Sequence, residues 1–190
     1  MPPRKPSKPW VDGLTIFEAL EQTASAFPGN DALVFPQEHL RLSYADLVRQ
    51  ASAVAKSLWA LGVRKGDHVA VWATNRSPWV LLQFATAQIG AVLGTVNPSY
   101  RTHELAYLLK QADISTLFLI DRFKTADYFS MLKEISPELP RSPAFPKLRR
   151  VISLTSIVPQ GILPWQEFLR AGAGVSDAVL SKARANVKPG

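Results

Sequence analysis

Cysteine is absent from this 190-residue sequence, and glycine, at 10 residues, is scarce. Without cysteine the chain has no thiol nucleophile, no cysteine-ligated zinc site and no iron–sulfur cluster. The same two shortages exclude a disulfide scaffold and a collagen-like repeat. Hydrophobic residues make up 47% of the chain and charged residues 19%. This composition is typical of a folded chain with a buried core, and the length fits one ordinary domain.

Residue patterns that mark common active sites are missing as well. The glycine-rich patterns G-x-G-x-x-G and G-x-x-x-x-G-K-[ST] and the elbow G-x-S-x-G do not occur. The only histidines are His39, His68 and His103, which are too far apart to form a local metal motif. We expect His39 and His68 to lie in strands and His103 in the first, solvated turn of a helix. Asn97 and Asp121 end predicted strands, where a turn-forming role is expected. We therefore assign no catalytic, cofactor-binding or metal residue.

Positive charge is concentrated in three segments. The net charge is +7, and ten of the 22 lysines and arginines lie in residues 1–11, 139–166 and 178–190, which contain no acidic residue. These segments are the chain ends and a proline-rich connection. A nucleic-acid-binding face would instead show basic residues on one helix, interleaved with aromatic residues. The pattern therefore predicts solvated basic segments and no nucleic-acid partner.

A charge-free stretch runs from Ser77 to Tyr100 and is long enough to cross a membrane. Gly90 and Gly94 in it have the G-x-x-x-G spacing of packed membrane helices. Polar residues interrupt the stretch, however, and its character changes at Gly90 from helix-like to strand-like. We expect a buried helix followed by a buried strand and no membrane span. A small membrane protein built on residues 77–100 is a third, alternative reading of the chain.

The hydrophobic pattern predicts helices around a hairpin, and then strands that alternate with helices. Thr15 and Ser43 each begin a capping-box pattern, and Gly62 follows the apolar stripe of the second helix. Strands alternating with helices indicate βαβ crossovers and a largely parallel sheet. In order, the expected elements are a helix from Thr15 to Phe27, a hairpin of 33–35 and 39–42, a helix from Ser43 to Leu61, strand 68–74, a helix capped by Ser77, strand 91–96, helix 102–112, strand 116–121, helix 124–135 and strand 149–154.

The sequence thus predicts an α/β fold in three parts. We expect a flexible, basic, proline-rich tail over residues 1–11, a folded subdomain over 12–170, and a weakly structured tail over 171–190. The first residues lack the apolar region of a secretory signal, and their prolines disfavour the amphipathic helix of a transit peptide. The expected location is therefore cytoplasmic.

Several segments resemble motifs of a known family, in order and at matching spacing. Leu42-Ser43-Tyr44-Ala45-Asp46-Leu47 is similar to a motif of the form Leu-(Thr/Ser)-Tyr-x-Glu-Leu, with Asp46 in place of the usual Glu. The other similar segments are residues 61–71, Asn75 with Trp79, residues 84–98 with Ile89-Gly90-Ala91 and Asn97-Pro98, Tyr100-Arg101-x-x-Glu104-Leu105, and Phe123-Lys124-x-x-Asp127-Tyr128. Over about residues 10 to 190 the series resembles the adenylate-forming (AMP-binding) superfamily, in its fatty-acid and acyl-CoA synthetase branch.

This resemblance implies an incomplete N-terminal domain of an adenylate-forming enzyme. The intact family joins a fatty acid to CoA at the expense of ATP, with Mg²⁺, and releases AMP and pyrophosphate. Its catalytic groups are a Thr/Ser/Gly-rich phosphate loop ending in Lys, an acidic residue for magnesium, a ribose-binding Asp and a C-terminal Lys. None of these matches a segment of this chain, so we expect the chain alone to bind no cofactor and to be inactive. We expect the coding sequence beyond codon 190 to supply the phosphate loop.

A second interpretation is a non-enzymatic interaction module that binds a partner through an unpaired edge of its sheet. If the chain is an incomplete ligase domain, the helix and strand from Trp79 to Val96 are expected to leave a large apolar face open, whereas a self-contained interaction module would close its own core. Such a face favours association between copies. We therefore also expect the chain to self-associate.

Overall fold

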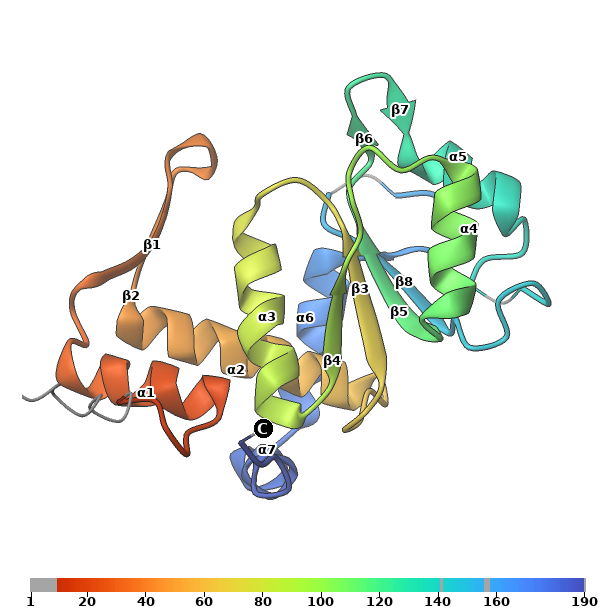
Figure 1. Cartoon of the computed structure of the whole chain (residues 1–190). Helices are drawn as coiled ribbons and strands as arrows, with labels where there is room; N and C mark the ends of the chain where they lie inside the picture. Colours follow the sequence, from red (N-terminus) through yellow and green to blue (C-terminus); the bar gives the residue numbers. More distant parts are fainter. Residues whose placement is uncertain (1–9, 141, 156–157, 190) are drawn as a thin grey trace, which may run out of the picture.

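A five-stranded parallel sheet organises the chain (Figure 1). The computed structural model describes residues 10–140, 142–155 and 158–189. In the order β4-β3-β5-β8-β9, the strands are β4 (Val92–Thr95), β3 (His68–Trp72), β5 (Ile114–Leu119), β8 (Arg150–Ser153) and β9 (Leu163–Pro164). All four pairings are parallel. The predicted α/β fold with a largely parallel sheet is confirmed.

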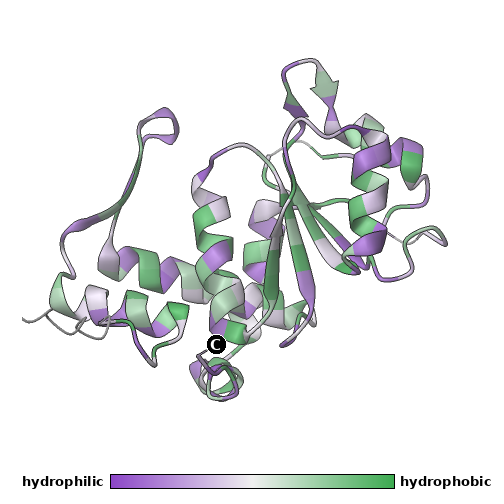
Figure 2. Cartoon of the chain, in the orientation of Figure 1, coloured by the Kyte–Doolittle hydropathy of each residue, from purple (hydrophilic) through white to green (hydrophobic). Residues whose placement is uncertain are grey.

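Helices cover both faces of this sheet (Figure 1). One face carries α2 (Tyr44–Ala60), α3 (Ser77–Ile89) and α6 (Trp165–Ala171), and the other carries α4 (Thr102–Gln111) and α5 (Tyr128–Ile135). Strands covered on both faces are apolar along their whole length rather than in alternation. All six residues of β5 are buried, and Figure 2 shows hydrophobic residues running along the central strands.

The N-terminal elements follow the sequence signals closely. They are α1 (Ile16–Ala26), β1 (Asp31–Phe35), the short 3-10 helix η1 (Pro36–Glu38) and β2 (Leu40–Ser43), which pairs antiparallel with β1. The Glu18 N–H donates to Thr15 Oγ1 (3.3 Å), and the Thr15 N–H donates to Glu18 Oε2 (2.8 Å), so the predicted capping box is confirmed. His39 was expected in a strand, but it lies in the turn with a left-handed φ of 50°, because the chain must reverse there.

Two helix starts differ from their predicted positions. Arg76, not Ser77, is the N-cap of α3, and the Ser77 N–H and hydroxyl donate to the Glu38 carboxylate at the hairpin tip. The helix expected from residue 124 begins only at Tyr128. The preceding residues form a small hairpin of β6 (Arg122–Phe123) and β7 (Ala126–Asp127), in which Lys124 has a φ of 53°. Asp127 then caps α5, because its carboxylate accepts from the Ser130 N–H (3.1 Å).

The C-terminal segment is folded, unlike the weakly structured tail expected from residue 171. The 3-10 helix η2 (Gly172–Gly174) packs on α2, and α7 (Asp177–Arg184) packs on α2 and α3. The sequence signal of α7 is weak because most of its residues are polar and only Leu180 and Ala183 are buried. Contacts with distant residues hold it instead, including an ion pair from Arg184 to Glu21. Of the expected N-terminal tail, residues 1–9 lie outside the described residues.

The charge-free stretch forms α3 and β4, separated by Gly90 with a φ of 72°, and α3 has 13 residues. Across the described ranges, no helix is both long and apolar enough to cross a membrane. Residues 77–100 therefore contain a helix and a strand and not one continuous helix. The apolar face expected over Trp79–Val96 is also smaller than anticipated, because α1, α2 and α7 pack on α3. Val92 in β4, 49% exposed, is the one large apolar side chain of this segment that counts as exposed.

Candidate functional site at the carboxyl edge of the sheet

The crossover connections change sides of the sheet between β3 and β5. This is where a ligand-binding site is expected in a parallel sheet. The connection from β3 to β4 passes over one face through α3, whereas the connection from β4 to β5 returns over the other face through α4. The loops that leave β3 and β5 therefore go to opposite faces. In open parallel sheets, ligands bind beyond the carboxyl ends of the strands at such a switch point.

Two stacked aromatic rings fill this position. Trp72 is the last residue of β3 and Tyr128 the first of α5. Their ring centroids are 3.6 Å apart with an interplanar angle of 2°, and both side chains are fully buried. The Tyr128 N–H donates to the Asp121 carbonyl (2.8 Å) just beyond β5. The two rings thus join β3, β5 and α5 at the carboxyl edge.

The polar ends of both rings bind the loop between β4 and α4, residues 97–101. The Trp72 Nε1–H donates to the Asn97 carbonyl (3.2 Å), and the Tyr128 hydroxyl donates to the Pro98 carbonyl (2.6 Å). The Asn97 side chain accepts the Ser99 N–H (2.9 Å) and closes a local turn. This loop contains the Asn97-Pro98 motif found in the sequence. The arrangement fixes the loop by hydrogen bonds to two successive carbonyls.

Three ionisable groups at this edge form hydrogen bonds to the backbone: the Tyr128 hydroxyl and the carboxylates of Asp127 and Glu104. Burial raises the pKa of Tyr128 to about 12, against the lesser influence of the Arg101 charge. Its hydroxyl is therefore protonated at neutral pH and acts as a hydrogen-bond donor. The hydrogen bond from the Ser130 N–H lowers the pKa of Asp127, and backbone hydrogen bonds at Glu104 and Arg101 lower the pKa of Glu104. Both carboxylates are ionised, and they cap the N-termini of α5 and α4. We therefore assign neither of them, nor Tyr128, a role in acid–base catalysis.

The structure brings together two of the polar residues noted in the sequence. Asn97 and Asp121 both lie at the carboxyl edge, and the predicted turn-forming role of Asn97 is confirmed by its bond to the Ser99 N–H. The Asp121 carboxylate lies 3.9 Å from Arg122 Nε and is 45% exposed. Their positions follow from the predicted strands, because strand ends in a parallel sheet meet at one edge.

The three histidines, in contrast, lie far apart. His39 is in the hairpin turn, His68 begins β3 at the opposite edge of the sheet, and His103 lies in the first turn of α4. The Nδ1 of His68 is 2.5 Å from the Ala112 carbonyl. Over the residues that the structure describes, no group of three or more His, Asp or Glu side chains could hold a metal ion. That this chain carries no catalytic residue stays a prediction.

Sequence analysis missed the stacked pair as the centre of this edge. Tyr128 was noted only as part of a motif, and Trp72 only as a strand residue. One signal was available: a tryptophan at the end of an apolar strand is buried, and its indole N–H then needs an acceptor nearby. The partner ring could not be found this way, because 55 residues separate Trp72 from Tyr128 in the chain.

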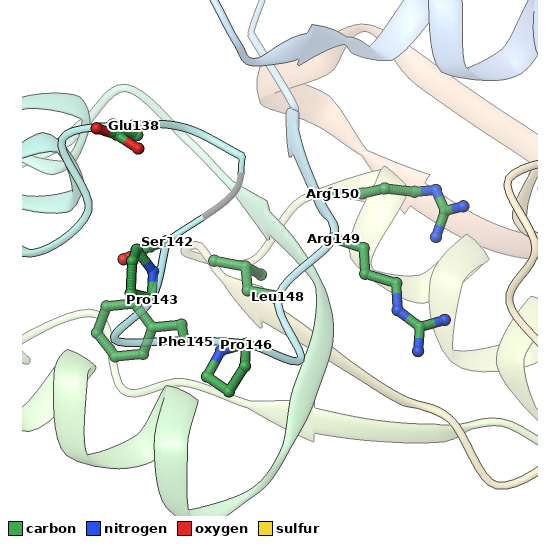
Figure 3. Close-up of a pocket in the computed structure, with 8 residues that line it drawn as sticks. All are labelled: Glu138, Ser142, Pro143, Phe145, Pro146, Leu148, Arg149 and Arg150. Carbon is green, nitrogen blue, oxygen red and sulfur yellow. The ribbon is translucent and has the colours of Figure 1, made fainter.

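A hollow of about 560 Å³ lies in the proline-rich connection before β8 (Figure 3). Figure 3 shows the Arg149 and Arg150 side chains directed away from the Phe145 and Pro146 rings. The lining comes from one stretch of chain at the amino end of β8, so polar groups from different elements do not converge on it. We therefore prefer the carboxyl edge as the candidate site. The lining residues are Glu138, Ser142, Pro143, Phe145, Pro146, Leu148, Arg149 and Arg150.

Comparison with known proteins identifies the same family that the sequence motifs resemble. Residues 20–172 match the family model described as AMP-binding enzyme. The chain is 40% identical over 175 residues to YngI of Bacillus subtilis, which its name assigns to the acyl-CoA synthetases; the match covers 88% of this chain and 32% of YngI. It is 38% identical over 165 residues to a mitochondrial medium-chain acyl-CoA ligase of Rattus norvegicus, covering 83% of this chain and 27% of the ligase.

A solved structure supports the fold independently. The anthranilate CoA ligase AuaEII, in complex with anthranoyl-AMP, superposes with a TM-score of 0.71 at 19% identity, over 83% of this chain and 28% of that chain. At this identity the likeness shows the fold alone. The chain spans about a third or less of the length of its curated relatives and corresponds to their N-terminal part. Because the family model matches most of its residues, the chain belongs to the AMP-binding enzyme family.

Proposed function

We propose that this chain is the N-terminal part of an ATP-dependent fatty-acid–CoA ligase. The family match over residues 20–172, together with relatives at 38–40% identity that are named as acyl-CoA synthetase and ligase, carries the proposal. In the intact enzyme, a carboxylate oxygen of the acid would bond to the α-phosphorus of ATP as pyrophosphate leaves. The CoA thiol would then bond to the acyl carbon, lose its proton and release AMP.

The residues of this chain do not fit a role in holding ATP or Mg²⁺. No phosphate-loop pattern occurs in the sequence, and the described residues contain no cluster of three metal ligands. What they offer is positioning, since Trp72 and Tyr128 hold loop 97–101 at the carboxyl edge. We therefore propose that fatty acid, ATP, Mg²⁺ and CoA are ligands of the intact enzyme and that this chain alone is inactive.

The remaining parts of the proposal concern organisation. We propose that residues 12–170 form the N-terminal subdomain. We also propose that the segment after it leads to the phosphate-binding loop of the longer enzyme. We propose a cytoplasmic location, which fractionation of cells expressing the tagged chain would test. We also propose that the chain by itself self-associates.

A chimera tests the ligase assignment. Residues 12–189 would replace the matching N-terminal part of YngI, and acyl-CoA formation would be measured with fatty acids of several chain lengths. We expect the chimera to form acyl-CoA, because 40% identity preserves the core on which the rest of the enzyme packs. A chimera that melts cooperatively but forms no acyl-CoA with any acid would contradict the proposal.

The inactivity of the isolated chain has a separate test. ATP–pyrophosphate exchange with the same fatty acids should stay at background, because the sequence contains no phosphate-loop pattern to stabilise the charge that develops at the α-phosphate. Exchange that survives a second purification and disappears on heating would show that a nucleotide site has been overlooked.

The interaction module is the second candidate function. One observation favours it: among the residues that the structure describes, no strand pairs with the outer side of β4, at one edge of the sheet.

A further inference from the structure

The two outermost strands of the parallel sheet, β9 and β4, differ in how they prevent pairing with another strand. At one edge, β9 has only two residues, one of them Pro164, which has no N–H to donate, and α6 follows at once. Short strands and proline are the usual means by which edges are kept from pairing. At the other edge, β4 has four residues and no proline. It lies within a stretch from Ser77 to Tyr100 that has no charged residue. The β4 edge is therefore unprotected.

Unused hydrogen-bonding groups line this edge. The Val92 N–H donates to the Asp67 carbonyl (2.9 Å) and the Val96 N–H to the Val71 carbonyl (2.9 Å), so both point towards β3. Backbone groups of successive residues in a strand alternate in direction. Those of Leu93 and Thr95 therefore face away from β3, and no described strand pairs with them. Each of these two residues offers one donor and one acceptor.

We propose that β4 pairs antiparallel with β4 of a second copy of this chain, about a two-fold axis at Gly94. In this register Leu93 of each copy faces Thr95 of the other, and each such pair exchanges two N–H···O=C bonds. All the outward groups of both strands are then satisfied. The two Gly94 residues face each other on the axis, as a non-hydrogen-bonded pair with Cα atoms about 4.5 Å apart.

Charge explains why a second copy suits this edge. The net charge of +7 comes from residues 1–11, 139–166 and 178–190, which contain ten basic residues and no acidic one, so contact between two copies through these segments is opposed by like-charge repulsion. The stretch around β4 is uncharged, so two copies can approach there without bringing like charges together. Contact there would also cover part of Val92, which is 49% exposed. The same surface on both partners gives a closed two-fold dimer rather than a filament. The proposal specifies the surface of the proposed self-association and does not depend on the ligase assignment.

Disulfide cross-linking tests the register directly. The chain has no cysteine, so Gly94→Cys introduces a single thiol. A Cβ at Gly94 has its nearest neighbour, the Val69 carbonyl, at an ordinary 3.7 Å, so the substitution fits the monomer. A Cα separation of about 4.5 Å lies within the range that disulfides span. Under mild oxidation we expect most of the variant to become a covalent dimer.

Tyr107→Cys is the matched control, because Tyr107 is 67% exposed on α4, which covers one face of the sheet away from its edges. It should give little covalent dimer under the same conditions. Equal cross-linking of the two variants, or more with Tyr107→Cys, would overturn the pairing through β4. In the second case the surface of α4 would be the interface.

A charge at the edge gives an independent measurement. Thr95 is exposed, and Thr95→Lys places two like charges near the two-fold axis. We expect the dimer dissociation constant from sedimentation to rise at least about tenfold, with an unchanged melting temperature at dilutions where both proteins are monomeric. Val34→Lys, at a 43% exposed position in β1, should leave the constant unchanged. A dimer that persists in Thr95→Lys overturns the β4 interface but not self-association, whereas a monomeric parent chain overturns both. Neither result bears on the YngI chimera.

Discussion

The two faces of the sheet are closed by different means. On the α4 and α5 side, elements close in sequence pack together, and Trp72 and Tyr128 join them to the strands. On the α2 side, α6 and η2 lie more than a hundred positions after α2 in the chain and pack on it. The Ser57 hydroxyl there donates to the Leu169 carbonyl (3.2 Å), and Gly172 lies against the same serine. One face thus contains a stacked pair of rings that joins several elements, and the other contains a close approach of two segments distant in the chain.

The largest effect should come from Trp72→Ala. Removing a fully buried aromatic side chain costs about 3–5 kcal/mol of the free energy of unfolding, and here it also removes the ring beneath Tyr128. Urea denaturation would measure the loss, and faster hydrogen exchange of the Ser99 amide would show that loop 97–101 has loosened. Trp10→Ala, at a 68% exposed position, should change little. A loss below about 1 kcal/mol in Trp72→Ala would mean that the stacked pair does not hold this face.

Gly172→Ala probes the other face. A Cβ at this position would lie 2.5 Å from Ser57 Oγ and 2.7 Å from the Ser57 backbone nitrogen, so the backbones must separate. Overpacking of this kind costs about 1–3 kcal/mol. Gly174 is in the same 3-10 helix but has nothing within 4 Å of its Cβ position, so Gly174→Ala is the matched control and should be close to neutral. Equal stability of the two variants in urea would contradict the close packing of η2 on α2.

The same contrast explains how much of the fold could be predicted from the sequence. The two capping boxes, the hairpin and the alternation from β3 to β5 all have local signals, and each was found within a few residues of its place. The segments β6–β7, β9–α6 and α7 were missed or judged weak. The hairpin β6–β7 is local, but α6 and α7 make contacts between distant positions, such as Leu169 with Ser57 and Arg184 with Glu21. No pattern within a short window reveals such contacts.

The candidate site also has some features that could be predicted from the sequence and others that could not. Asn97 and Asp121 could be placed at one edge because each follows a predicted parallel strand. That loop 97–101 is fixed by the ring ends of Trp72 and Tyr128 could not be predicted, because it requires the side-chain packing between β3 and α5. The family resemblance is confirmed by the match over residues 20–172, and the structure shows that the Asn97-Pro98 motif lies in the loop held by the two rings.

Tyr128→Phe sharpens the comparison at the α4 and α5 side. Loss of the hydroxyl bond to the Pro98 carbonyl should cost about 0.5–1.5 kcal/mol at neutral pH. The pKa of Tyr128 in the folded protein, about 12, exceeds the ordinary tyrosine value of about 10, so the folded state favours the protonated form. This contribution to stability is complete below pH 10 and is lost as the pH rises towards 12.

The pH dependence of unfolding measures this contribution. Between pH 10 and 12 the stability of the parent chain should fall more steeply than that of Tyr128→Phe, by at most about 1.4 kcal/mol per pH unit for one proton. Tyr107→Phe, at an exposed position, is the reference variant. Identical slopes in the parent chain and Tyr128→Phe would show that burial of this hydroxyl does not couple to folding.

The smallest effects concern the ion pairs that hold the C-terminal segment. Both Arg184 terminal nitrogens donate to the Glu21 carboxylate, one at 2.6 Å, and the two side chains are 29% and 34% exposed. The pair of Arg41 and Asp31 in the hairpin is 64% and 50% exposed. Bidentate, partly buried ion pairs are stronger than solvated ones, whose median contribution to the free energy of unfolding is about 0–1 kcal/mol. Glu21→Gln should therefore lower stability by about 1 kcal/mol and Asp31→Asn by less than about 0.5 kcal/mol. In 1 M salt the gap should shrink but persist, because partial burial limits screening. If both variants unfold in urea at the same midpoint as the parent chain, packing on α2 and α3 alone holds α7, and the ion pair to Glu21 contributes nothing.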